Sequence, residues 1–206
     1  MIVTALDFET ANCSDASICA VGIAVFERGE LKESLHWLVR PPKGHGFFRE
    51  DFIECHGLTW FDVQGEPEFP GIASRVLECL ANAEIIVAHN AHFEMRMLRG
   101  TMGHFGLAYP ELRFLCTLQA ARRVWPELPS HNLGALASHI SHDFQHHDPE
   151  ADANAAGRVF LAMMHETGAA TLGDFIEKTG IQLHHLPAGE WSAPANISLE
   201  AATPNI

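Results

Sequence analysis

Hydrophobic positions form three strand-like runs in the first part of the chain. The runs cover residues 2–7, 18–26 and 31–39, and their short, largely apolar character is typical of strands. Arg28-Gly29-Glu30 separates the second run from the third and has the composition of a hairpin turn. We therefore expect the chain to open with antiparallel strands.

The stretch that follows, from Pro41 to Pro70, is rich in glycine and proline and indicates loop structure. Pro41-Pro42 ends the third run, because proline cannot donate a hydrogen bond to a sheet ladder. Within this stretch only His56-Gly57-Leu58-Thr59 suggests the start of a short turn or helix.

From residue 71 onward, helical spacing of apolar residues alternates with short apolar runs. Ile72, Val76 and Leu80, for example, share one face of a helix. Strands are expected at 84–88 and 113–116, and helices around 72–80 and at 90–105, 117–125, 132–140, 149–166 and 171–179. Antiparallel strands followed by strand–helix alternation predict an α/β domain with a mixed five-stranded sheet flanked by helices.

The chain of 206 residues is long enough for one domain with a substantial core. We expect that domain to span residues 1–167. Residues 168–206 are expected to form a C-terminal helix and then an irregular tail, because 187–206 is rich in Pro, Ala, Asn and Ser.

Charge and cysteine content narrow the class of protein. The net charge of −13 argues against a basic face that grips long nucleic acid, so a polyanionic substrate would need a short footprint and a metal to attract it. The five cysteines are scattered and never spaced as C-x-x-C, which indicates reduced thiols in a cytoplasmic protein. No apolar run approaches the length of a membrane span, so no membrane partner is expected.

Asp7 and Glu9 lie at the end of the first apolar run. Side chains two residues apart on a strand point to the same face, so the two carboxylates would stand side by side, with Phe8 facing the core. Two neighbouring carboxylates repel unless a cation lies between them, and oxygen ligands suit Mg²⁺ or Mn²⁺. The alternative is an exposed strand end with two solvated acids.

A second acidic cluster, His89-Asn90-Ala91-His92-Phe93-Glu94, lies where a buried strand passes into a helix. Open α/β sheets bind ligands at this edge. Asn90 is a candidate N-cap, and Glu94 lies in the first turn. A capped helix with a favourable acid in its first turn explains the same residues without a function.

The third cluster begins the helix at 149–166. Asp148 as N-cap and Pro149 at the first helical position form a strong start signal. Asp152 then lies one turn into the helix as a fixed ligand, while His147 stays in the preceding segment as a movable base. Capping accounts for Asp148 but not for Asp152 or for the paired histidines.

In their order along the chain, these three clusters resemble the DEDDh family of 3′–5′ exonucleases. Four further stretches resemble the bacterial branch of this family that is related to the proofreading (epsilon) subunit of DNA polymerase III. They are Asp7-Phe8-Glu9-Thr10-Ala11-Asn12, His56-Gly57-Leu58-Thr59, Leu115-Cys116-Thr117-Leu118 and Trp125-Pro126 through Ser130-His131. The resemblance covers about residues 1–165 and implies a ribonuclease H-like fold.

The same resemblance implies hydrolysis at the 3′ end of a DNA or RNA strand, with release of nucleoside 5′-monophosphates and two Mg²⁺ or Mn²⁺ ions. Asp7 would bridge both metals, Glu9 and Asp152 would complete the first site, and Glu94 would support the second. His147 would take the proton from the attacking water, and its spacing to Asp152 favours it over His146.

Substrate contacts are implied for three more residues. The backbone of Thr10 and Ala11 would meet the terminal nucleotide, and His92 would reach a phosphate, although a solvated helix face explains His92 equally well. Polymerase or repair proteins are the protein partners that the resemblance suggests.

Glu94 departs from the family pattern, which has Asp at this position. A carboxylate one methylene longer can still reach a cation, but Mg²⁺ tolerates little distortion of its octahedral shell. Two alternatives therefore stay open. The chain could be a degenerate, exonuclease-like binding module of a polymerase or repair complex, or an oligoribonuclease-type enzyme acting on short RNA.

Overall fold

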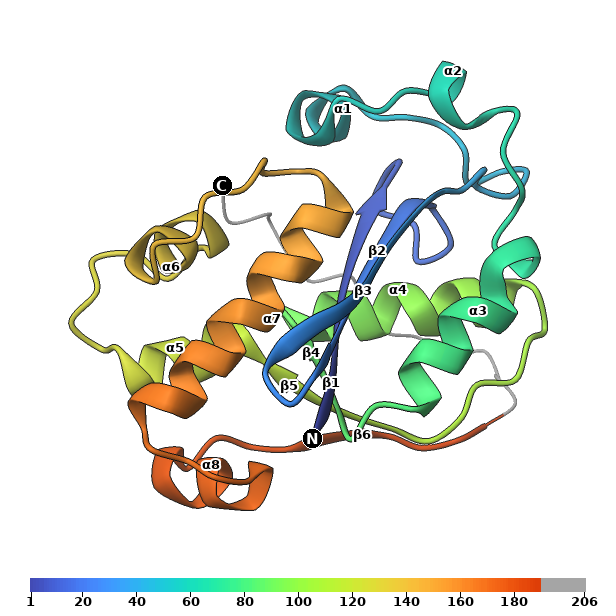
Figure 1. The fold of residues 1–206 in the computed structure, drawn as a ribbon. Helices are drawn as coiled ribbons and strands as arrows, with labels where there is room; N and C mark the ends of the chain where they lie inside the picture. Colours follow the sequence, from blue (N-terminus) through green and yellow to red (C-terminus); the bar gives the residue numbers. More distant parts are fainter. Residues whose placement is uncertain (190–206) are drawn as a thin grey trace.

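A mixed six-stranded sheet forms the centre of the protein in a computed structural model, which describes residues 1–189 (Figure 1). The strand order is β3-β2-β1-β4-β5-β6. The strands are β1 (Ile2–Thr10), β2 (Ile18–Glu27), β3 (Glu30–Leu38), β4 (Ile85–Ala88), β5 (Leu112–Cys116) and β6 (His184–Leu186).

The first three strands form an antiparallel meander, as the hydrophobic pattern predicts. Glu27 pairs with Glu30 across a two-residue turn in which Arg28 and Gly29 both have positive φ, at 54° and 86°. This turn matches the right-handed twist of the flanking strands, so the hairpin expected at this point is confirmed. β4 and β5 then run parallel to β1.

The prediction of five strands is wrong by one. β6 pairs antiparallel with β5, with Leu112 opposite Leu186. Its three residues lie in the segment expected to carry a helix and an irregular tail, and a run this short has no detectable periodicity. Pairing with an existing sheet edge is what makes it a strand. The remainder of the expected tail, residues 190–206, lies outside the described residues.

Helices cover both faces of the sheet. On one face, Val3, Ala5 and Phe26 pack with α5, α6, α7 and α8. On the other face, Leu6 and Phe8 pack with α3 and α4. These helices are α3 (Pro70–Ala81), α4 (Ala91–His104), α5 (Thr117–Val124), α6 (Leu133–His139), α7 (Pro149–Glu166) and α8 (Leu172–Thr179).

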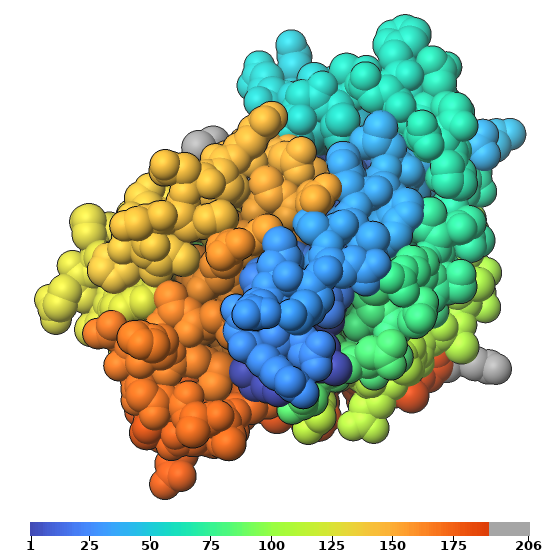
Figure 2. All heavy atoms as spheres, in the orientation of Figure 1, coloured from blue at the N-terminus to red at the C-terminus, as the bar shows by residue number. Residues whose placement is uncertain are grey.

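The space-filling view shows the β2–β3 hairpin at the surface between α7 and α3 (Figure 2). Side chains along β1 alternate between the two faces of the sheet. Val3 and Ala5 point toward α7, and Leu6 and Phe8 point toward α3 and α4. This alternation fixes the face on which the acids at the end of β1 emerge.

The stretch between β3 and α3 contains two short helices. The sequence pattern missed α1 (Glu50–His56), whereas α2 (Trp60–Val63) begins directly after the stretch from His56 to Thr59 that was expected to start a turn or helix. Neither has the repeated apolar face of a buried helix, and α1 buries no residue. α2 begins with a capping box in which Thr59 and Asp62 bond reciprocally. In Figure 1 both helices lie beyond the end of β1.

Among residues 1–189, no helix combines the length and the apolar character that crossing a bilayer requires.

Candidate active site

Three carboxylates from two elements meet at the end of β1. Asp7 and Glu9 extend from β1 and Asp152 from the first turn of α7, and one oxygen of each lies within 4.8 Å of the others. Asp7 and Glu9 share a face of the strand while Phe8, only 3% exposed, packs into the opposite core. The shared face predicted from the Asp-x-Glu spacing is therefore observed.

Helix α7 packs closely against the sheet, and this packing brings Asp152 to Asp7 and Glu9. Gly22 lies opposite Asp7 in the β1–β2 ladder, and a Cβ on Gly22 would overlap the backbone of Pro149 and Glu150. Further along, a Cβ on Gly157 would overlap the ring of Phe26. The two glycines thus permit contact between helix and sheet that any larger residue would block.

Local capping fixes where α7 begins. The side chain of Asp148 accepts a hydrogen bond from the N–H of Ala151 at 3.0 Å, and Pro149 occupies the first helical position. Helix α7 therefore begins at the residue that the Asp-Pro signal predicts. Asp152, only 4% exposed, is held on a rigid element.

His147 lies directly before this cap with a left-handed backbone, at φ 65°. Its N–H donates to Oδ2 of Asp152 at 2.8 Å, and its exposed ring lies 3.5 Å from Sγ of Cys55 on α1. Burial of part of the ring and the neighbouring His146 lower the pKa of His147, which favours the neutral form that can accept a proton.

The ring of His146 also approaches the acids. Nδ1 of His146 lies 3.0 Å from Oδ1 of Asp152, and the two histidine rings stack with centroids 4.6 Å apart. The structure thus brings both histidines to Asp152, His147 through its backbone and His146 through its ring. Spacing along the chain alone did not predict the contact of His146.

The electrostatics of the three acids are unfavourable without a cation. Burial, and then Asp152 and Asp148, raise the pKa of Asp7 well above its ordinary value. Burial and the same neighbours, with Asp7 foremost, raise the pKa of Glu9 to about 9, and burial raises the pKa of Asp152 to about 6. Within residues 1–189, no Lys or Arg forms an ion pair with any of the three.

Glu94 approaches from the other layer, in the first turn of α4, and lies outside the group of three. Its side chain is 3% exposed, and Oε2 is buried without a hydrogen-bond partner. Burial and the charges of Asp7 and Glu9 raise its pKa well above the ordinary value, and a hydrogen bond from the backbone of Phe8 offsets only part of the rise.

Asn90 precedes α4 as expected, but it caps the helix differently from the prediction. Its backbone is left-handed, at φ 70°, and its side chain makes no capping hydrogen bond. Asparagine tolerates this conformation better than most residues, which allows the sharp turn from β4 into α4.

The residues predicted to touch substrate lie in different surroundings. Thr10 and Ala11 are buried at the end of β1, where the N–H of Ala11 bonds to Ser17 O at 2.8 Å and its carbonyl accepts from Arg49 N at 2.9 Å. His92 is exposed, and its ring packs edge-on against Phe114 and His184. The structure therefore places His92 beside β5 and β6 and does not bring it into the acid group.

Two residues near the site were not singled out as site residues by the sequence. Gly22 could have been found from its position inside an apolar strand, where glycine often marks a close backbone approach. Cys55 carries no sequence signal, because its contact with His147 joins residues 92 positions apart.

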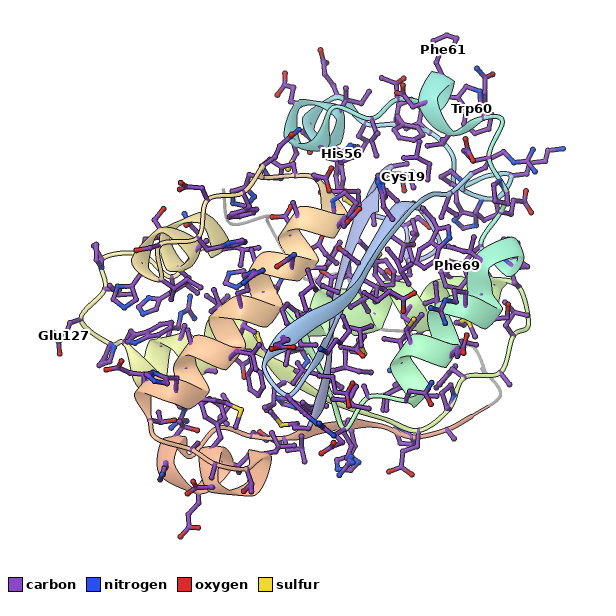
Figure 3. The ribbon with its side chains drawn as sticks, viewed as in Figure 1. Cys19, His56, Trp60, Phe61, Phe69 and Glu127 are labelled. Atoms are coloured by element: carbon purple, nitrogen blue, oxygen red, sulfur yellow. The ribbon has the colours of Figure 1, made fainter. Side chains whose placement is uncertain are left out.

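His56 fastens α1 to the end of β1. Its Nδ1 accepts from the N–H of Leu58 at 3.0 Å, and its Nε2 lies 3.1 Å from the carbonyl of Thr10. Figure 3 shows His56 below α1. A ring that accepts at Nδ1 and donates at Nε2 is neutral, in agreement with a pKa lowered by burial.

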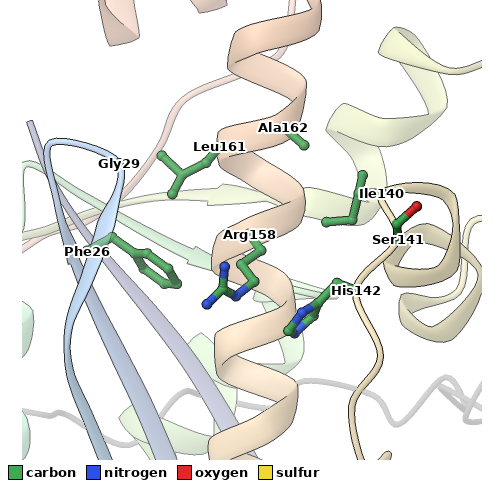
Figure 4. A pocket seen from close by; sticks show the side chains of 8 residues that line it. All are labelled: Phe26, Gly29, Ile140, Ser141, His142, Arg158, Leu161 and Ala162. Carbon is green, nitrogen blue, oxygen red and sulfur yellow. The ribbon is translucent and has the colours of Figure 1, made fainter.

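A separate hollow of about 270 Å³ lies against the outer side of α7 and contains none of these acids (Figure 4). Its lining includes Phe26, His142, Arg158 and Leu161. The acid group lies at the end of β1, away from this hollow.

The three-layer fold and the acid group at the end of β1 define a nuclease-type α/β domain. A model of the exonuclease (RNase_T) family matches residues 4–160, so the chain belongs to this family. The membership agrees with the resemblance that the three sequence clusters indicated.

The chain is similar to parts of much longer bacterial proteins. It is 27% identical over 164 residues to the 3′-5′ exonuclease DinG of Bacillus subtilis, covering 77% of this chain and 17% of that protein. It is 26% identical over 161 residues to the PolC-type DNA polymerase III of Halalkalibacterium halodurans, covering 77% of this chain and 11% of that protein.

Solved structures share the fold at low sequence identity. Exonuclease X, in complex with 5′-overhanging duplex DNA, matches with a TM-score of 0.67 and 22% identity over 86% of this chain and 99% of that one. The nuclease domain of 3′hExo, a DEDDh family member bound to rAMP, matches with a TM-score of 0.67 and 14% identity over 89% and 96%.

Proposed function

We propose that this protein is a metal-dependent 3′–5′ exonuclease that releases nucleoside 5′-monophosphates from the single-stranded 3′ end of DNA or RNA. The observation that carries the proposal is the group of Asp7, Glu9 and Asp152, whose oxygens lie within 4.8 Å of one another without a Lys or Arg partner in the described residues.

The donor set fits hard divalent cations. All the donors are carboxylate oxygens, and Glu94 adds a buried oxygen that has no hydrogen-bond partner. Mg²⁺ and Mn²⁺ prefer oxygen ligands, and a bound cation would reverse the unfavourable burial of these charges. Asp7, Glu9 and Asp152 would hold one ion, and Asp7 with Glu94 would hold a second.

Bound metal would supply a nucleophilic water and neutralise charge on the leaving oxygen. Within the chain, His147 accepts the proton of the attacking water. Its ring is exposed on a segment with left-handed backbone, and its N–H anchors it to Asp152. Partial burial and the neighbouring His146 lower the pKa of His147, which favours the unprotonated ring that can accept this proton. Contacts of the terminal nucleotide with Thr10, Ala11 and His92 belong to the same proposal.

One observation favours a second candidate function. Glu94 stands where the family pattern has Asp and lies outside the group of three close oxygens, so a site without a second metal is the alternative. In that case the chain would be an inactive, exonuclease-like binding module. The relatives that the chain matches are far longer proteins, among them a DNA polymerase III. Polymerase or repair proteins as partners of this chain are proposed from those relatives and from no contact in the structure. We further propose residues 1–167 as the catalytic unit of a cytoplasmic protein.

The test is hydrolysis of a 5′-labelled single-stranded oligonucleotide with Mg²⁺ or Mn²⁺, run beside Asp7→Ala and His147→Ala. We expect stepwise shortening from the 3′ end, stopped by EDTA. Loss of the general base should lower kcat about 10²–10⁴-fold. Circular dichroism and melting curves check that both variants fold. Equal degradation by wild type and Asp7→Ala would indicate contamination and refute the proposal.

A further inference from the structure

Large exposed apolar side chains are concentrated in the segment between β3 and α3. Phe47 is 75% exposed, Trp60 40% and Phe61 81%. Among residues 1–189, the only other large exposed apolar residue is Leu31, on the β2–β3 hairpin. Exposed aromatic rings gathered in one segment, away from any core, indicate a surface that contacts something else.

This segment is fastened to the strand that carries the acids. Nδ2 of Asn12 donates to the carbonyls of His45 and Phe47 at 2.8 and 2.7 Å. The N–H of Arg49 donates to the carbonyl of Ala11 at 2.9 Å. Together with the contact of His56 on Thr10, these bonds hold Phe47 and helix α1 against the chain at the end of β1.

A hollow of about 380 Å³ opens between two of these rings. Phe47 and Trp60 line it, together with the basic side chains of Arg40 and Lys43. The ring of Trp60 lies against Gly46, where a Cβ would be 3.1 Å from Cζ3. Glu68 is the one acid in the lining, and Arg40 pairs with it at 3.6 Å. Lys43 has no ion pair among the described residues.

Phe61 lies next to Trp60 on α2, and Figure 3 shows both at the outer end of the segment, beyond His56. Helix α1, which at 1.5 Å per residue is about 10 Å long, precedes α2 in the chain and carries Cys55, whose Sγ lies 3.5 Å from the ring of His147. A strand whose 3′ end reaches Asp7 would therefore pass this surface a short distance upstream.

We propose that Phe47, Trp60 and Phe61 form a stacking surface for bases of the single strand upstream of the 3′-terminal nucleotide. The inference rests on the proposed function and adds a binding surface for the part of the substrate upstream of the active site. Aromatic rings bind bases of any sequence through their faces, and Lys43 is placed to meet a phosphate. In a protein of net charge −13, uncharged stacking supplies affinity that a basic groove cannot.

The test compares Phe47→Ala/Phe61→Ala with wild type on a twelve-residue thymidine oligomer and on the p-nitrophenyl ester of thymidine 5′-monophosphate. Contacts remote from the reacting phosphate are the same in ground and transition state, so KM should rise with kcat unchanged. We expect KM for the oligomer to rise about fivefold or more, and hydrolysis of the small ester to stay as in wild type. Leu31→Ala, which removes an exposed apolar side chain elsewhere, is the matched control.

Binding measurements separate the two proposals. Fluorescence anisotropy of the labelled oligomer in EDTA reports binding without hydrolysis, and we expect weaker binding by the double variant at an unchanged salt slope. Lys43→Ala should instead make the salt dependence shallower. Equal oligomer binding by the double variant and wild type would overturn the stacking surface, as would equal losses on both substrates. A wild type that hydrolyses neither substrate would overturn the proposed function.

Discussion

The two sides of the candidate site are built in different ways. On the α7 side, Asp7, Glu9 and Asp152 meet through regular elements in van der Waals contact. On the α4 side, Glu94 approaches alone, buried and short of hydrogen-bond partners. Asp7 and Glu9, which share a strand face, are placed by local geometry, whereas Asp152 and Glu94 depend on where their helices begin.

The short strand β4 explains the second arrangement. It pairs with β1 only from Val3 to Ala5, while β1 continues to Thr10. The last residues of β1 therefore have no strand on that side, and the N–H of Phe8 is free to bond to Glu94. The acid reaches the site around the open edge of the sheet. Three experiments can break or sharpen this contrast between a packed side and a single buried acid.

The largest loss of stability and activity is expected from Gly22→Ala, which disturbs the packing of α7 on the sheet. The added methyl would push α7 away from β2 and carry Asp152 from its neighbours. Overpacking of this kind costs about 1–3 kcal/mol of stability, and a shift of about 1 Å in a catalytic group lowers activity about 100-fold. Denaturant unfolding and oligonucleotide hydrolysis measure the two losses.

Gly65→Ala is the matched control for this substitution, because nothing lies within 4 Å of a Cβ at that position. It should behave like wild type. A Gly22→Ala protein with unchanged stability and activity would show that α7 is not held by this contact.

A smaller effect is expected on the α4 side. Glu94→Gln keeps the shape of the side chain but removes the charge, and should lower activity about 10–100-fold. Glu94→Asp should stay within about tenfold of wild type, with a changed ratio of Mg²⁺ to Mn²⁺ activity, because the shorter acid alters the metal shell. Strong activation of a silent wild type by Glu94→Asp would instead support the binding-module alternative.

The smallest effect is expected in the pH dependence of metal-free stability. Raised pKa values in Glu9 and Asp152 mean that the folded state holds these protons more tightly than the unfolded state. Stability is therefore greatest below the ordinary carboxyl pKa and falls as pH rises through about 6 for Asp152 and about 9 for Glu9. Melting in EDTA should drop by about 4 °C or more between pH 5 and pH 8.

Added Mg²⁺ should remove this slope, because a cation at the site stabilises the ionised carboxylates. The control is Asp7→Asn, which takes one charge from the group. It should melt higher than wild type in EDTA and respond less to Mg²⁺. A wild type whose melting temperature in EDTA rises between pH 5 and pH 8 would contradict the raised pKa values.

Sequence and structure agree most closely where the determining contacts are local. The period of two along β1 places Asp7 and Glu9 together and Phe8 in the core. The Asp148-Pro149 pair begins α7 at the predicted residue. Each depends on backbone geometry over a few residues, which the amino-acid order specifies directly.

Features that depend on distant partners were missed or misplaced. β6 exists as a strand because β5 offers it an edge, and α1 lies in a segment whose periodicity is too short to detect. The contacts of the exposed His92 ring with Phe114 and His184 also join distant parts of the chain, and the sequence did not predict them. The role of Gly22 becomes visible only when the backbone of Pro149 lies against it.

The sequence by itself determined the class of fold, the faces of the first strand and the three acidic clusters, because periodicity and capping act between near neighbours. Only the tertiary structure decided that Asp152 closes the group with Asp7 and Glu9, that Glu94 lies apart, and that aromatic side chains border the same strand end. These outcomes depend on how layers pack across the sheet, and that packing joins residues up to 145 positions apart, as for Asp7 and Asp152.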